Sequence, residues 1–327
     1  METGKDPAQL HFEAARRKAF WNEIGRLLSG RSNRLLSWGD VQEELHLNEF
    51  SEREVVPVPL DRIVGSVGRY REFDRAFMPK LDSTGPRWRS VASAHFGDIS
   101  LPPITLYQVD RTYFVVDGHH RVSVARELGR AYVDARVIEA RARVPVSTNL
   151  DADSLQIAGE HTRFLERTRL DILRSEQNVE FTTFGAYEWA LEHIALHRQA
   201  MSEERGRMVT QDEAVVDWYD HIYLPLVRII REKDILAEFP RRTEADLFLW
   251  ILDHQHELAE RCGPDVSQER AAEHLTQRYA VHPVKRFVQA ARERVAGPAC
   301  ASLVDHERGH PGAAMDDGNP SPSDEQE

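Results

Sequence analysis

The fold is decided by the stretch Tyr113-Phe114-Val115-Val116-Asp117-Gly118-His119-His120-Arg121-Val122-Ser123-Val124-Ala125-Arg126-Glu127-Leu128-Gly129. Its first four residues are an apolar, mostly β-branched or aromatic run of strand length, and the run ends at an Asp-Gly pair. Val122, Ala125 and Leu128 then follow at helical spacing, and Gly129 is a typical helix stop. The pattern predicts a strand, a tight turn and a helix.

The first turn of this predicted helix carries three consecutive cationic or titratable side chains, His119, His120 and Arg121. Acidic residues are usual there, because the free N–H groups of a helix start already carry partial positive charge. Gly118 has no Cβ, so a phosphate could approach the backbone closely. We therefore expect an anion site. The alternative is that Asp117 caps the helix, Arg121 pairs with a carboxylate, and the histidines are ordinary surface residues.

The segment that begins Leu101-Pro102-Pro103-Ile104-Thr105-Leu106-Tyr107 and continues through this stretch resembles the ParB/sulfiredoxin superfamily. Members share P-P-I-x-V, a hairpin, and then G-E-R-R in ParB proteins, G-C-H-R in sulfiredoxins or D-G-H-x-R in ParB-like serine kinases. The similarity covers about residues 55 to 140, and D-G-H-x-R is the closest short match. His119 stands where sulfiredoxins have their reactive cysteine, so no thiol chemistry carries over.

The resemblance implies a bound nucleoside triphosphate, ATP or CTP, together with Mg²⁺. Its phosphates would lie on Gly118, His120 and Arg121. A second loop that faces the same pocket would add Ser66, Gly68 and Arg69. Catalytic roles would fall to Asp117 and His119, with Asp61 or Glu72 as the second carboxylate. We expect no metal site built from protein ligands alone.

Charge is distributed unevenly along the 327 residues, whose net charge is −12. Residues 1–150 hold 22 Lys and Arg against 20 Asp and Glu, whereas residues 151–327 hold 20 against 34. DNA, if it is bound, would therefore meet the N-terminal half. The sequence has no apolar run of about 18 residues and no apolar signal segment near Met1, which predicts a soluble, cytoplasmic protein without a membrane partner.

The periodicity predicts an α+β fold with four parts. Residues 1–54 form a helical extension, with a helix over residues 8–29 and a short one around residues 41–45. Residues 55–141 form a small α+β unit, which the resemblance implies is a mixed-sheet domain like those of the ParB/sulfiredoxin superfamily. Within it we expect an edge strand over residues 55–63, helices over 69–78 and 87–95, a hairpin of 104–109 with 112–116, and a strand over 133–137. The turn at Asp110-Arg111 lacks glycine, so we expect a hairpin loop longer than two residues.

Residues 155–296 form the third part, an all-α domain that follows a linker over residues 141–154. Helices are expected over residues 160–173, 185–201, 211–233 with an interruption at Pro225, 243–261, 267–279 and 283–295. His193 and His197 have metal-ligand spacing, but helix-packing hydrogen bonds fit their apolar neighbours better. This acidic domain is a candidate platform for a protein partner. Residues 297–327, rich in Gly, Pro, Ser and Asp, are expected to be disordered.

Three functions fit these features. The first is a nucleotide-dependent, DNA-associated regulator or a nuclease-type hydrolase of the ParB-like kind. The second is an ATP-dependent kinase of a small hydroxylated metabolite, which the absence of a basic DNA-reading helix favours. The third is a non-catalytic protein that binds partners through its helical half. Whether the protein is an enzyme stays open at this stage.

Overall fold

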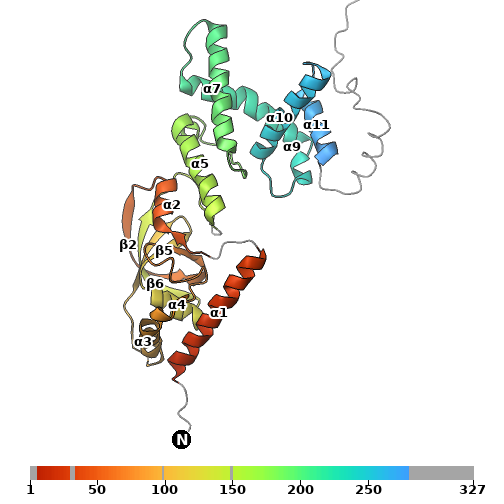
Figure 1. Ribbon diagram of the computed structural model, residues 1–327. Helices are drawn as coiled ribbons and strands as arrows, with labels where there is room; N and C mark the ends of the chain where they lie inside the picture. Colours follow the sequence, from red (N-terminus) through yellow and green to blue (C-terminus); the bar gives the residue numbers. More distant parts are fainter. Residues whose placement is uncertain (1–5, 30–33, 98, 148–149, 280–327) are drawn as a thin grey trace, which may run out of the picture. The chain divides into compact units, whose positions relative to one another are not determined.

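The computed structural model of the chain describes residues 6–29, 34–97, 99–147 and 150–279 (Figure 1). Its contacts divide these residues into two compact units. The first comprises the described residues up to 225 together with 242–246, and the second comprises 226–241 and those from 247 onward. The linker expected over residues 141–154 lies inside the first unit. The helix expected over 283–295 and the tail from 297 lie outside the described residues.

A six-stranded mixed sheet is the centre of the first unit. Its strands lie in the order β1-β3-β5-β4-β6-β2. The pairs β1–β3, β3–β5 and β4–β6 are parallel, and β5–β4 and β6–β2 are antiparallel. The strands are β1 (Leu36–Ser37), β2 (Phe50–Pro59), β3 (Ile63–Ser66), β4 (Ile104–Val109), β5 (Thr112–Asp117) and β6 (Tyr132–Ala140). A mixed sheet combined with many helices agrees with the expected mixture of α and β structure.

The strand expected over residues 55–63 is two strands in the structure. β2 ends at Pro59 and lies at one edge of the sheet, as its prolines predicted. A 3₁₀ turn, Leu60–Arg62, then carries the chain to β3, which pairs with β5. Gly65 and Ser66 therefore belong to a buried strand, and the loop expected around them begins at Val67. This separation is what places Ser66 beside β5.

The helix expected over residues 69–78 is wrong, because this segment is an irregular loop. The buried Asp74 carboxylate accepts a hydrogen bond from the Met78 N–H at 2.7 Å and one from Asn22 Nδ2 at 2.7 Å. Phe77 adopts a left-handed backbone conformation, with φ +58°, which a helix cannot contain. Asp side chains that bind nearby backbone N–H groups compete with the helical hydrogen bonds. Phe73 and Phe77 are buried by the loop instead.

Helices cover both faces of the sheet (Figure 1). The face that carries Ile104, Leu106 and Val115 packs against Val122 of α4 (His119–Glu127). The opposite face packs against Trp38 of α2 (Trp38–Glu44), whose ring stacks on Tyr107 at 4.5 Å and meets Phe114 edge-on. Two further helices, α1 (Pro7–Ser29) and α3 (Gly85–Phe96), form a small core beside α4 with Phe12 and Trp88. The turn between β5 and α4, where the sequence predicts an anion site, thus lies at the edge of the sheet from which α4 begins.

The hairpin of β4 and β5 is tighter than expected. Only Asp110 and Arg111 connect the strands, because Asp110 takes the left-handed conformation, with φ +49°, that glycine would otherwise supply. Asp tolerates this conformation better than most residues do. The expected helix over residues 87–95 and strand over 133–137 are present as parts of α3 and β6.

Helices dominate the chain after β6. The first unit continues with α5 (Ala152–Thr168), α6 (Leu170–Leu173), α7 (Ala186–Arg205) and α8 (Gln211–Trp218), and α9 (Leu224–Glu232), α10 (Glu244–Cys262) and α11 (Gln268–Tyr279) follow. The interruption expected at Pro225 is a π turn over Tyr219–Tyr223, just before the proline. Pro225 cannot donate a helical hydrogen bond and crowds the preceding turn. None of the helices in the described residues combines the length and apolarity that crossing a bilayer demands.

Candidate functional site

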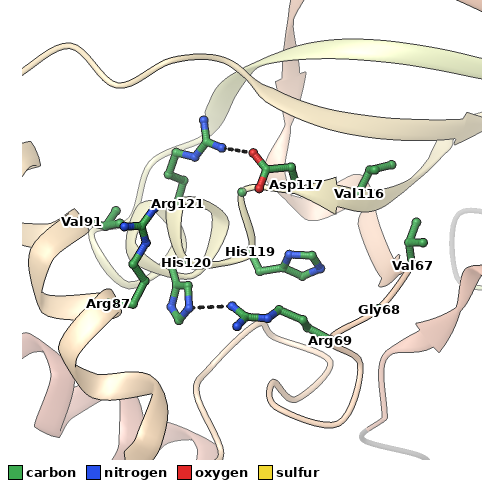
Figure 2. Close-up of a pocket in the computed structure, with 11 residues that line it drawn as sticks. Val67, Gly68, Arg69, Arg87, Val91, Val116, Asp117, His119, His120 and Arg121 are labelled. Atoms are coloured by element: carbon green, nitrogen blue, oxygen red, sulfur yellow. Dashed lines mark hydrogen bonds and ion pairs between the residues drawn. The ribbon is translucent and has the colours of Figure 1, made fainter.

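The strand–turn–helix stretch forms one wall of a pocket, as the sequence predicted. β3 and β5 are parallel neighbours, so their carboxyl ends lie at the same edge of the sheet. α4 begins at this edge, directly after β5. A cavity of about 380 Å³ opens there, and we call it the anion pocket after the expectation raised by the sequence; it is lined by residues 67–69, Arg87, Val91 and residues 116–121 (Figure 2).

Gly118 is required by the geometry of the turn. Its φ of +102° lies in the region that L side chains rarely adopt. A Cβ at this position would meet Ile104 Cγ2 at 2.4 Å. Gly118 is also the N-cap residue of α4, and no side chain caps the helix. The alternative in which Asp117 caps α4 is therefore wrong, and the first N–H groups of the helix keep no side-chain cap.

Arg121 and Asp117 form an ion pair at the rim of the anion pocket. Arg121 Nη2 lies 2.5 Å from Asp117 Oδ2. The same guanidinium donates to the carbonyl oxygens of Pro102 and Pro103, the second at 3.0 Å. The Arg121 side chain is only 16% exposed, whereas that of Asp117 is 74% exposed. Arg121 therefore lines the pocket and also joins α4 to the loop before β4 by hydrogen bonds.

His119 and His120 are buried beneath the pocket, each 7% exposed, so they are not ordinary surface residues. His119 Nε2 lies 2.7 Å from Ser66 Oγ, and His120 Nε2 lies 2.9 Å from Arg69 Nη1. Burial, assisted by the Arg69 charge, lowers the pKa of both imidazoles to about 4. Both rings are thus neutral at pH 7, and the positive charge of the pocket comes from its arginines.

The loop after β3 supplies the opposite wall (Figure 2). Ser66 Oγ accepts hydrogen bonds from the N–H groups of Gly68 at 3.3 Å and Arg69 at 3.1 Å. These bonds shape the loop so that the Arg69 side chain reaches His120. Glu72 does not line the pocket; its Oε1 lies 3.3 Å from Arg69 Nε.

Asp61 is not brought to the anion pocket. It lies in the 3₁₀ turn before β3, whereas the pocket opens after Ser66 at the far end of that strand. The four residues of β3 separate the two ends by roughly 10 Å. Asp61 instead faces Arg126, in the last turn of α4. Asp117 is therefore the one carboxylate among the described residues that line the pocket.

Arg87 is a pocket residue that the sequence did not single out. It comes from the first turn of α3, is exposed, and makes no hydrogen bond or ion pair with any described residue. That turn contains no acidic residue, as in α4. A cation in the first turn of a helix was the signal that identified His119 to Arg121, and the same signal in Gly85-Pro86-Arg87 would have identified Arg87.

The described residues contain no group of three or more His, Cys, Asp or Glu side chains arranged to hold a metal ion. The histidines of α7 make packing contacts, as favoured above. His193 Nδ1 accepts from Trp218 Nε1 at 2.8 Å, and His197 Nε2 lies 2.8 Å from Asp217.

Comparisons with known proteins are sparse. No family model matches the chain, and no curated protein does. Among solved structures, sulfiredoxin from Arabidopsis thaliana aligns at 20% identity with a TM-score of 0.22, over 27% of this chain and 89% of its own. A Pnob8-like ParB-N domain aligns at 12% identity with a TM-score of 0.19, over 75% of this chain and 98% of its own. Both names belong to the superfamily that the sequence resembles, but scores this low carry no argument about function.

Proposed function

We propose that this protein binds a nucleoside triphosphate, ATP or CTP, with the phosphate groups in the anion pocket. The observation that carries the proposal is the Arg87 guanidinium, which has no partner among the described residues and lines a pocket where three arginines meet one carboxylate. Bare N–H groups at the start of α4 add to the attraction for an anion. A volume of about 380 Å³ is in the range of small-molecule sites.

Asp117 is the residue that would hold Mg²⁺ with the nucleotide. Its carboxylate lines the pocket and is largely exposed, and one of its oxygens is engaged by Arg121. One carboxylate together with phosphate oxygens is a common way for proteins to bind Mg²⁺. The ion would neutralise phosphate charge in hydrolysis or transfer.

The bound nucleotide would serve a DNA-associated function, as a regulator or a nuclease-type hydrolase. Support for this output is the motif resemblance of residues 55–140 and the nearly balanced charge of the N-terminal half. A second candidate is phosphoryl transfer to a small hydroxylated metabolite. The exposed Asp117 carboxylate at the pocket rim favours it, because it could accept the proton of an incoming hydroxyl. The acidic helical half would bind a protein partner.

Calorimetric titration of the full chain with ATP and with CTP, each with and without Mg²⁺, tests the proposal. Arg87→Ala should weaken binding about 10-fold or more, because one charge-assisted hydrogen bond is lost. Thermal stability should not change, since the side chain makes no hydrogen bond or ion pair with the described residues. The matched control is Arg136→Ala, which removes an exposed arginine of β6 outside the pocket. Equal affinity in both variants, or no binding by the parent, would refute the proposal.

The two outputs are separated by a second step with the same protein. Phosphate release that rises on addition of duplex DNA favours the DNA-associated function. Transfer of phosphate to one of a panel of hydroxylated amino acids favours the kinase. Asp117→Asn should abolish either reaction while ATP binding without Mg²⁺ is retained, because a neutral amide binds the ion more weakly than a carboxylate and cannot accept a proton.

A further inference from the structure

The hydrogen bonds of His120 fix the position of its proton. Nε2 lies 2.9 Å from Arg69 Nη1, and a guanidinium can only donate, so Nε2 is the acceptor. A neutral imidazole carries one proton, which must then be on Nδ1. His120 Nδ1 is buried and has no hydrogen-bond partner within the described structure. A buried N–H donor without a partner is costly unless a ligand satisfies it.

His119 is held in the same tautomer by Ser66. The Ser66 hydroxyl oxygen already accepts from the backbone N–H groups of Gly68 and Arg69, so its own proton is directed to His119 Nε2 at 2.7 Å. His119 Nε2 is therefore an acceptor, and Nδ1 carries the proton. Ser66 is completely buried, which leaves the hydroxyl no competing partner in solvent.

Burial keeps the two rings neutral, and the charged groups around them add to this effect. Arg69 and Arg87 oppose protonation of His120, and Arg69 opposes that of His119, whereas Asp117 favours protonation of His119. Two of these groups also lie in ion pairs, because Asp117 binds Arg121 and Arg69 binds Glu72. The uncharged ring of Phe73 packs against both imidazoles, with ring centroids 6.3 Å apart for His119 and 5.5 Å apart for His120.

We propose that Ser66 and Arg69 are positioning residues that hold His119 and His120 as neutral Nδ1–H donors, which bind the terminal phosphate of the ligand. This inference rests on the proposed nucleotide function and adds what the pocket recognises. Apart from Asp117, the polar side chains that line the pocket are three arginines and these two histidines, which offer only donors when Nε2 of each ring is engaged. A surface made of donors suits a phosphate group whose oxygens are all acceptors, so the dianionic terminal phosphate is favoured over the monoanionic diester of a nucleic-acid backbone.

The arrangement has a distinct pH signature. Binding through a cationic histidine loses about 10-fold in affinity for each pH unit above its usual pKa near 6.5. Neutral donors have no such loss. The terminal phosphate gains its second charge above about pH 6. ATP affinity should therefore stay constant or rise between pH 5.5 and 8.

Nitrogen-15 NMR of the imidazole rings in the full, ligand-free chain tests the tautomers directly. His119 and His120 should each show a protonated Nδ1 at pH 7, and His119→Gln and His120→Gln should each remove one of these signals. Ser66→Ala should release His119 to a mixture of tautomers and weaken ATP binding about 10-fold. Ser90→Ala, an exposed serine of α3, should change neither. Because the parent protein reports the tautomers by itself, an unstable Ser66 variant does not weaken the test.

The outcomes separate this inference from the proposed function. Protonated Nε2 atoms or cationic rings at pH 7 overturn the inference even when ATP binds. An ATP affinity that falls from pH 6.5 to 8 overturns it as well. Protonated Nδ1 atoms in a protein that binds neither ATP nor CTP support the positioning by Ser66 and Arg69 and refute the nucleotide function.

Discussion

Gly118→Ala should destabilise the protein by about 2–5 kcal/mol, for two separable reasons. The backbone φ of +102° costs an L side chain about 1–2 kcal/mol. The new Cβ would also stand 2.4 Å from Ile104 Cγ2 and 2.8 Å from Ile104 Cβ, and relieving this overlap shifts β4 against α4. Overpacking of this kind costs about 1–3 kcal/mol.

Gly129→Ala is the matched control for Gly118→Ala, because Gly129 follows the other end of α4. Its φ is +68°, but a Cβ there meets nothing within 4 Å, so only the backbone cost applies. Urea unfolding followed by circular dichroism gives both free energies of unfolding. Gly118→Ala should lose about 1–3 kcal/mol more than the control. Equal losses would refute the crowding by Ile104, and a neutral Gly118→Ala would refute the left-handed turn itself.

Three further predictions concern stability. Burial lowers the pKa of His161 to about 4, so the neutral ring stabilises the fold above pH 6.5, and this stabilisation is lost as the pH falls towards 4. In urea unfolding, the free energy of unfolding of the parent protein should fall by about 2 kcal/mol more than that of His161→Phe between pH 7 and 5. Equal losses in the two proteins would contradict this prediction. Arg126→Met leaves carbonyls around β3 without their donor and should cost about 3 kcal/mol, whereas Arg130→Met, at an exposed site, should cost little by the same assay. Asp151→Ala removes the capping box of α5 and should lower the free energy of unfolding by about 1 kcal/mol, which a lower melting temperature would report. Asp153→Ala, in the same first turn, should leave the melting temperature unchanged. Equal shifts in the two variants would argue against the cap.

Local signals in the sequence were sufficient for β5, its turn and α4. The apolar run, the Asp-Gly pair and the helical spacing up to Leu128 lie within one short stretch, so neighbouring residues determine the conformation. The edge position of β2 was also local, because Pro57 and Pro59 restrict pairing. For the same reason the sequence placed Asp117 to Arg121 together at the end of β5, where the structure shows that they line a pocket.

Contacts between distant residues account for what the sequence did not predict. The helix expected over residues 69–78 is replaced by a loop because Asp74 binds Asn22 and Met78. β3 is too short to be recognised without its partner β5. The neutral state of His119 and His120 depends on burial, which periodicity cannot give for a helix start.

The anion pocket has a further consequence, because its walls come from three stretches that are distant in sequence. The loop after β3, the first turn of α3 and the start of α4 meet only once the sheet has formed. The unfolded chain therefore has no binding site for the ligand. A ligand that fills the pocket contacts all three segments and stabilises the folded state. A ligand present at 100 times its dissociation constant would add about 2.7 kcal/mol to the free energy of unfolding. Thermal unfolding in the presence of each candidate nucleotide would rank the nucleotides by how far each raises the melting temperature, before any reaction is known.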